Sequence, residues 1–536
     1  MTSHTRHEER ATPVGTDVRG QRSTPSTDTV PLTVLGLAVL TTLLRLPILG
    51  APVSADEGGF LMVARQWRPG SSLYGDYWVD RPPLLVALFQ GADALGGLPA
   101  LRLLGCLAAG LTVLAVGLAG HRAAGPVAAT WSAAVAGGLL VSPLIGVVQV
   151  NGELLAAPFV AGGVWLAILA VQAPERRIGW AALGAGACAA AAVLVKQNML
   201  DVVVFGGALG LLCLRQGILR AAELRRLALW FGAGGLVTVV AVLGLAGLRG
   251  TSPGGVLFAM YPFRLDAAFA AGHVTPVERL FRLARLGGAE LLTGAPLVLA
   301  ALVFVMLAVR RRPGPPPWPR HRPLAFAVAV AALALTAYDV VSVVVGGSYW
   351  LHYLVQLTIP AALAAGLVAV ATPRPGRALV VVVLVSATLA WTASLVRLTP
   401  AEGEAVGTAI GRAAKPGDTM VSAFGDANIP FSAGLASPYP YLWSLPARTL
   451  DTRFRHLGAV LAGPDAPTWL VARGPTTLAL LDQHSPGVAL RGRYHHVGEV
   501  CGRAIYLRDG VHRRAPVFRG GCRQPVSTWF LEAGIP

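Results

Sequence analysis

Residues 31–60 read PLTVLGLAVLTTLLRLPILGAPVSADEGGF, so a long apolar run is followed closely by two adjacent carboxylates. The run from Pro31 to Leu46 approaches the length of about 20 residues that a helix needs to cross the hydrocarbon core. If it crosses a membrane, Asp56 and Glu57 lie at the far water–lipid boundary. Ionisable groups held there beneath apolar helices are costly to keep and usually functional. The alternative is a solvated loop that happens to be acidic.

The composition of the whole chain is that of a membrane protein. Of its 536 residues 54% are hydrophobic and only 13% are charged, and the mean hydropathy is +0.60. Apolar runs of span length recur along the sequence. We therefore predict an α-helical polytopic membrane protein.

The spacing of these runs predicts about eleven transmembrane helices, near residues 31–48, 100–120, 127–148, 154–172, 179–195, 200–214, 227–248, 291–309, 323–345, 353–371 and 378–396. With a cytoplasmic N-terminus, every short loop rich in arginine falls on one side, as the positive-inside rule requires. The net charge of +17 is then a topology signal and not a nucleic-acid-binding surface. We expect a multi-pass protein of the cell (plasma) membrane.

Three domains follow from the composition. Residues 1–30 are polar and lack periodicity, which predicts a disordered cytoplasmic tail. Residues 31–397 form the transmembrane domain, with helices lying in the interface in the first outer loop. Residues 398–536 contain no apolar run of span length, and a helix at 401–414 with strands near 419–424, 468–472 and 503–507 predicts a small extracytoplasmic α/β domain.

The five cysteines fall into two groups, one in the transmembrane domain and one in the C-terminal domain. Cys106, Cys188 and Cys213 lie in apolar runs and are interpreted as small core residues. Cys501 and Cys522 lie in the domain placed outside the cytoplasm, where a disulfide is plausible. The loop at 249–290, with Tyr261, Phe263 and Arg264 before an arginine-rich face, is interpreted as an amphipathic interfacial helix, and contact with anionic lipid or phosphate is the alternative.

The first outer loop continues with residues 73–84, LYGDYWVDRPPL. Here the sequence resembles the GT-C class of membrane glycosyltransferases, in the protein-mannosyltransferase-like branch that includes the lipid A aminoarabinose transferases. These families carry the carboxylate pair, then a tyrosine, an acidic residue and Lys/Arg-Pro-Pro-Leu. The residues that match in order and spacing are Asp56, Glu57, Tyr74, Asp76 and Arg81-Pro82-Pro83-Leu84. Arg81 stands where lysine is common, which argues against any role that needs a neutral amine.

Weaker similarities cover most of the chain from residue 31 to about 450. Asn151-Gly152-Glu153 resembles the second acidic loop of the family, and Lys196-Gln197 resembles its recurring Lys-Gln pair. The segment from Tyr349 to Pro360, with His352, Tyr353 and Gln356, resembles its His-Tyr…Gln…Pro motif.

The resemblance implies transfer of a sugar from a polyprenyl-phosphate donor to an acceptor at the outer membrane face, with inversion at the sugar carbon. Asp56 is then the general base that takes the acceptor proton, and Glu57 positions Asp56 or the acceptor. The lipid phosphate leaves with negative charge and needs cations, for which Arg81, Lys196 and His352 are the candidates. Other residues expected to bind substrate are Tyr74, Asp76, Glu153 and Tyr353. The acceptor is a glycan, lipid or protein, and nucleic acid is not expected.

Several of these residues also have a plain structural interpretation. Lys196 at a helix end can simply extend its amine to the interface, and Glu153 can solvate a loop. His352 and Tyr353 fit an interfacial aromatic belt equally well. Asp80 is expected to pair with Arg81, and Asp339, inside an apolar run, must face the bundle or a partner.

No strong metal-binding pattern is present in the sequence, so a divalent cation near Asp56 and Glu57 is compatible with the residues but not implied. The main alternative function is a secondary transporter or exporter of an envelope component. Transporters gather polar groups at the middle of the membrane and contain internal repeats, whereas here the polar groups collect at one edge. A third alternative is a membrane-anchored binding protein, for which so many spans are excessive.

Overall fold

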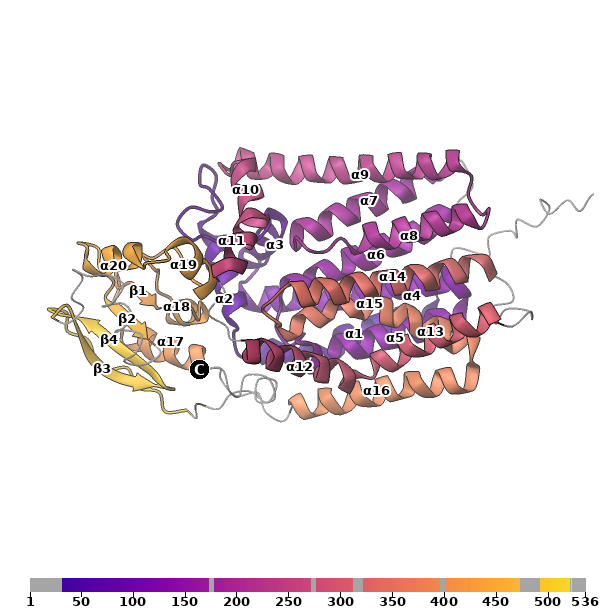
Figure 1. Cartoon of the computed structure of the whole chain (residues 1–536). Coiled ribbons are helices and arrows are strands. Elements are labelled where there is room, and N and C mark those ends of the chain that lie inside the picture. The colour runs from indigo at the N-terminus through magenta and orange to yellow at the C-terminus, as the bar shows by residue number, and fades with distance from the viewer. Residues whose placement is uncertain are drawn as a thin grey trace, which may run out of the picture.

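A computed structural model describes residues 31–172, 178–270, 276–311, 322–395, 402–423, 425–472, 492–520 and 522. The tail expected at residues 1–30 lies outside them. Long helices form one bundle, and a smaller part with a β-sheet covers one end of it, next to α2 and α11 (Figure 1).

Helices run through all of the predicted spans: α1 (Leu32–Leu44), α4 (Leu98–Ala124), α5 (Pro126–Val141), α6 (Gly152–Gln172), α7 (Ile178–Val195), α8 (Asp201–Arg215), α9 (Ala221–Leu248), α13 (Ala295–Arg311), α14 (Arg322–Val345), α15 (Thr358–Ala371) and α16 (Pro373–Leu395). Within the described residues, seven helical segments are long and apolar enough to cross a membrane. The number rises to eight if α12 (Pro276–Thr293) and α13, which meet at 72°, form one bent span. A helical multi-pass membrane protein is thus confirmed, and the number eleven stays a prediction.

Small residues let the helices of the bundle approach closely. A Cβ atom added at Gly186 of α7 would lie 1.8 Å from the carbonyl oxygen of Phe231 on α9, and one at Gly234 would lie 1.9 Å from that of Leu183. Because apolar burial does not drive association within lipid, such close backbone packing is one of the attractions that hold helices together there. Asp339 on α14 is fully buried beside Asp201 of α8, so it faces the bundle interior as expected.

The segment predicted as the first outer loop, which keeps that name below, contains two helices, α2 (Ala55–Gln66) and α3 (Pro83–Ala94), after the 3₁₀ turn η2 (Leu46–Gly50). Residues 57–64 of α2 are all buried, because α3 covers one side and α18 (Asn428–Ala433) covers another. The helix expected in this loop is therefore present, but protein covers it where a membrane surface was expected. Further short elements complete this end: η3 (Pro143–Ile145), α10 (Pro253–Met260), α11 (Pro262–Ala270) and η5 (Leu351–Leu357).

The C-terminal part packs helices against a four-stranded sheet of order β1-β2-β4-β3. Its remaining elements are α17 (Glu402–Ala413), β1 (Met420–Ser422), α19 (Ser444–Leu450), α20 (Arg455–Ala462), β2 (Trp469–Ala472), β3 (Tyr494–Val500) and β4 (Arg503–Arg508). β1 and β2 are parallel, and the other pairs are antiparallel. The boundary predicted near residue 398 falls outside the described residues.

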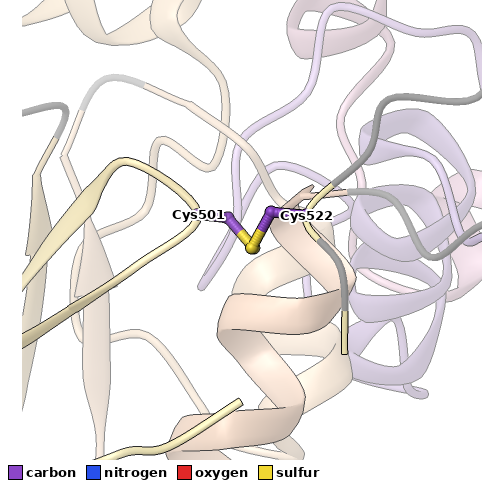
Figure 2. Close-up of a disulfide and its surroundings, with 2 residues drawn as sticks. All are labelled: Cys501 and Cys522. Atoms are coloured by element: carbon purple, nitrogen blue, oxygen red, sulfur yellow. A yellow bond between two sulfur atoms is a disulfide. The ribbon is translucent and has the colours of Figure 1, made fainter. Parts of the chain in front are cut away.

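Cys501 and Cys522 form a disulfide, as expected, across 21 residues (Figure 2). It ties the turn between β3 and β4 to the chain beyond the last strand. The other three cysteines are free, and Cys106 and Cys213 are buried while Cys188 is partly buried.

Candidate active site

Asp56 lies in the first turn of α2, which begins with a capping box. The Ser54 hydroxyl accepts a hydrogen bond from the Glu57 amide at 3.1 Å, and the Glu57 carboxylate accepts one from the Ser54 amide at 3.1 Å. A carboxylate in the first helical turn is also favoured by the helix dipole. Asp56 is partly exposed, and its Oδ1 accepts a hydrogen bond from Trp443 Nε1 at 3.1 Å.

Glu57 is fully buried and points away from that surface. Its two carboxylate oxygens accept hydrogen bonds from the Arg102 guanidinium at 3.3 and 3.2 Å, and Oε1 also accepts one from the Val150 amide at 3.1 Å. A carboxylate engaged in this way is not placed to contact a substrate. The arrangement favours the positioning role for Glu57, because it fixes α2 to α4 behind Asp56.

Asp80 lies between two arginines. Arg81 Nη1 is 2.7 Å from Asp80 Oδ1, which confirms the expected pair, and Arg264 Nη2 of α11 is 2.6 Å from Oδ2. Burial raises the pKa of the Asp80 carboxyl, but Arg264, Arg81 and Lys196 outweigh burial, so that the pKa lies below its ordinary value. Asp80 therefore stays ionised and holds two guanidinium groups side by side.

A second charged group forms where α6, the end of α7 and η5 meet. Lys196 Nζ is 2.8 Å from Glu153 Oε1, and His352 Nε2 is 3.9 Å from the same oxygen. Lys196 Nζ also lies 5.3 Å from the centre of the Tyr353 ring, in a cation–π arrangement. The four residues that the sequence singled out separately thus form one cluster.

The two charged groups are neighbours. Gln197, directly after Lys196, donates a hydrogen bond to the Asp80 carbonyl at 3.3 Å. Asp56 interacts electrostatically with both Arg81 and His352. The base candidate and the cations therefore share one site, which we call the charged cluster: Asp56, Asp80, Arg81, Glu153, Lys196, Arg264, His352 and Tyr353.

Tyr74 and Asp76 differ in their relation to this cluster. The Tyr74 hydroxyl donates a hydrogen bond to the Arg81 carbonyl at 3.2 Å, and burial raises the pKa of that hydroxyl. Tyr74 thus supports the backbone at Arg81. Asp76 is exposed at the surface of the loop, outside the charged cluster.

Arg264 was not singled out from the sequence as a site residue, since its loop fitted an interfacial helix. The available signal was its position beside Tyr261 and Phe263, in a loop on the same side as the carboxylate pair. Phe263 packs against Trp78 with ring centroids 4.4 Å apart, and this contact brings α11 to the first outer loop. Within the described ranges, no three His, Cys, Asp or Glu side chains are grouped so that they could hold a metal ion.

Comparison with solved structures identifies the architecture. The crystal structure of ArnT from Cupriavidus metallidurans bound to undecaprenyl phosphate matches 89% of this chain and 97% of its own, with a TM-score of 0.59 and 16% sequence identity. The chain has the GT-C fold. This confirms the fold that the resemblance of the first outer loop implied.

Two archaeal structures have the same GT-C architecture. The apo oligosaccharyltransferase of Archaeoglobus fulgidus matches 86% of this chain and 72% of its own, with a TM-score of 0.54 and 12% identity. AglB from Archaeoglobus fulgidus, in complex with an inhibitory peptide and a dolichol-phosphate, matches 89% and 74%, with a TM-score of 0.51 and 11% identity. No family model matches this sequence, and no curated protein sequence does.

Proposed function

We propose that this protein is a glycosyltransferase that moves a sugar from a polyprenyl-phosphate donor to an acceptor hydroxyl. The observation that carries the proposal is the placement of the partly exposed Asp56 beside a cluster with three basic side chains, Arg81, Lys196 and Arg264. A base next to cations is what displacement of a phosphate by a hydroxyl requires. The GT-C fold supports the proposal, since ArnT was solved with undecaprenyl phosphate and AglB with a dolichol-phosphate.

In the proposed reaction the acceptor oxygen attacks the anomeric carbon as the bond from that carbon to the phosphate oxygen breaks. Asp56 takes the hydroxyl proton, and the polyprenyl phosphate leaves with the bonding electrons. A single displacement of this kind inverts the sugar carbon. The leaving phosphate gains negative charge, which Arg81 and Arg264 can meet with planar, paired N–H groups.

Glu153 and Lys196 have a related task in this proposal. Both are almost completely buried, so their ion pair is strong only if its geometry is held. We assign Lys196 to the phosphate and Glu153 to the orientation of Lys196 and His352. Tyr353 lines the same cluster, while Asp76 is assigned to the acceptor side because it is exposed at the loop surface.

The proposed location is the outer face of the cytoplasmic membrane. The disulfide supports it, since disulfides persist in oxidising compartments. The arginine-rich loops also fall on the side opposite to the charged cluster in the predicted topology. The cluster would then bind a lipid-borne donor and an envelope acceptor from the same side. The experiment below tests whether a glycan, a lipid or a protein is the acceptor.

The test uses the full-length protein in lipid nanodiscs, with a panel of radiolabelled polyprenyl-phosphate sugars and envelope extracts as acceptors. Transfer of label from one donor, lost on the order of 10²–10⁴-fold in Asp56→Asn, supports the proposal. The matched control is Asp266→Asn, at an exposed carboxylate of α11 outside the cluster. Absence of transfer from every donor, or full transfer in Asp56→Asn, would contradict it. Uptake of substrate into sealed proteoliposomes, without transfer, would favour a transporter.

A further inference from the structure

The segment Ser437–Trp443 of the C-terminal part lies against the first outer loop. The backbone amide of Ser437 donates a hydrogen bond to the Tyr77 hydroxyl at 3.0 Å, and the Trp78 amide donates one to the Pro440 carbonyl at 3.0 Å. The Trp443 ring packs on the Phe60 ring of α2, with centroids 5.1 Å apart. Three contacts thus fix this segment directly beside the carboxylate pair.

The C-terminal part packs so closely against α2 that no side chain fits at Gly58 or Gly59. A Cβ atom added at Gly59 would lie 2.3 Å from Trp443 Cζ2 and 2.8 Å from Ala427 Cβ. One added at Gly58 would lie 3.1 Å from the backbone Cα of Asn428. The two glycines after Glu57 therefore let the C-terminal part reach the helix that carries Asp56.

The segment is also anchored within its own domain. The Tyr439 hydroxyl donates a hydrogen bond to Asp451 Oδ2 at 3.0 Å. Asp451 in turn accepts hydrogen bonds from the backbone amides of His456 and Leu457, at 3.1 and 2.9 Å, at the start of α20. Because Tyr439 and Asp451 are both buried, the path of the chain toward Trp443 is set by the C-terminal fold.

The indole of Trp443 donates its only N–H group to Asp56 Oδ1, at 3.1 Å. Among the described residues, no other hydrogen bond to the Asp56 side chain is found, so Oδ2 is free to accept a proton. We propose that Trp443 is a positioning residue, which holds Asp56 by Oδ1 and presents Oδ2 to the acceptor hydroxyl. This inference rests on the proposed function and deepens it, because it makes the C-terminal domain part of the active site.

An indole suits this task chemically. Its N–H group only donates and neither ionises nor accepts a proton at ordinary pH, so it cannot compete with Asp56 for the acceptor proton. In the transfer step the hydroxyl proton passes to Oδ2, and the hydrogen bond on Oδ1 stays in place throughout. A base held in one orientation reacts faster, because the reacting atoms are already aligned.

The decisive variant is Trp443→Phe in the full-length protein, since it removes the N–H donor and keeps an aromatic ring on Phe60. We expect kcat to fall roughly tenfold to a hundredfold, the size of a lost hydrogen bond to a charged group. KM for the polyprenyl-phosphate donor and the melting temperature should stay close to those of the wild type. The matched control is Trp469→Phe, because Trp469 also donates Nε1–H to an aspartate, Asp418, at 3.1 Å but lies in the domain core.

Trp469→Phe should lower the melting temperature and should leave kcat unchanged when kcat is measured at a temperature at which the variant is folded. If Trp443→Phe also loses stability, the double variant with Asp56→Asn decides. Equal kcat in Asp56→Asn and in the double variant shows that Trp443 acts through Asp56. An added loss in the double variant, or wild-type kcat in Trp443→Phe, overturns the inference. Failure of the proposed function is distinguishable, because there the wild type itself transfers nothing or Asp56→Asn remains active.

Discussion

Arg264 Nη2 and Asp80 Oδ2 lie 2.6 Å apart, and this ion pair joins α11 to the first outer loop. The other oxygen of Asp80 holds Arg81, so one carboxylate sets the spacing of two guanidinium groups. Lys196 and Glu153 lie next to them. The position of Arg264 is therefore the link between a loop near the middle of the sequence and the motif near its start.

Replacing Arg264 should weaken transfer strongly. Arg264→Met removes one of the cations proposed to meet the leaving phosphate, and we expect kcat/KM to fall roughly 10²–10³-fold. Arg264→Lys should recover only part of the activity, because an ammonium group cannot form a planar paired contact. The control is Arg279→Met, an exposed arginine of α12. Equal losses in Arg264→Met and Arg279→Met would point to a general charge effect.

Asp80→Asn should act on binding more than on the chemical step. Without the carboxylate the two guanidinium groups repel each other and lose their common anchor, so KM for the donor should rise roughly tenfold. The loss of kcat should be milder than in Asp56→Asn. Initial rates over a range of donor concentrations separate the two effects. Similar losses of kcat in the two variants would mean that Asp56 is wrongly assigned as the base.

The buried pair of Glu57 and Arg102 should matter for stability. Arg102→Met leaves a buried carboxylate without its partner, which destabilises by roughly 3–5 kcal/mol. Glu57→Gln retains a side-chain oxygen that can accept the hydrogen bond from the Ser54 amide, so it should destabilise the protein less than Arg102→Met. Thermal melting in detergent checks both. A fall in kcat for folded Glu57→Gln as large as that of Asp56→Asn would instead give Glu57 a direct catalytic role.

The C-terminal domain should lose stability in acid through Asp418. Burial raises the pKa of the Asp418 carboxyl, but hydrogen bonds from Arg513, from the Lys415 amide and from Trp469 lower it more, so the folded pKa lies below the ordinary value. The stabilisation is fully present above the unfolded pKa of about 3.9 and is lost as pH falls through the folded pKa. Melting temperatures of the full-length protein from about pH 6 to about pH 3 should fall more steeply than those of Asp418→Asn. Parallel curves would contradict this.

Topology can be tested with single cysteines. In a variant that lacks all five native cysteines, an impermeant maleimide added to intact cells should label Arg68→Cys and should label Arg377→Cys only after lysis. Both positions are exposed, and they lie on opposite sides in the predicted topology. The reverse pattern would place Asp56 on the cytoplasmic face and end the case for an outer active site.

The sequence predicts local features of this molecule better than its long-range contacts. The spans follow from apolar runs, and the capping box is visible as Ser54 followed three residues later by Glu57. Arg102 could have been found too, because an arginine inside an apolar span must pair with something. β3, with its sequence YHHVGEV, lacks the alternation of a typical strand and was not predicted.

The contacts of Arg264 and Trp443 with the first loop have no local signature. Each depends on two segments far apart in sequence that meet only through tertiary packing. Nothing in the sequence around Trp443 indicates that its ring packs against Phe60 of α2. The roles of such residues can be recognised only from the three-dimensional structure.

The glycine pair after the carboxylates has a consequence for engineering. A chimera that exchanges the domain beyond residue 398 for that of another GT-C protein must supply an indole close to Gly59 and a backbone that passes close to Gly58, as Asn428 does here. A grafted domain whose surface does not fit against Gly58 and Gly59 cannot approach α2 as closely. The chimera will then assemble with Asp56 misaligned.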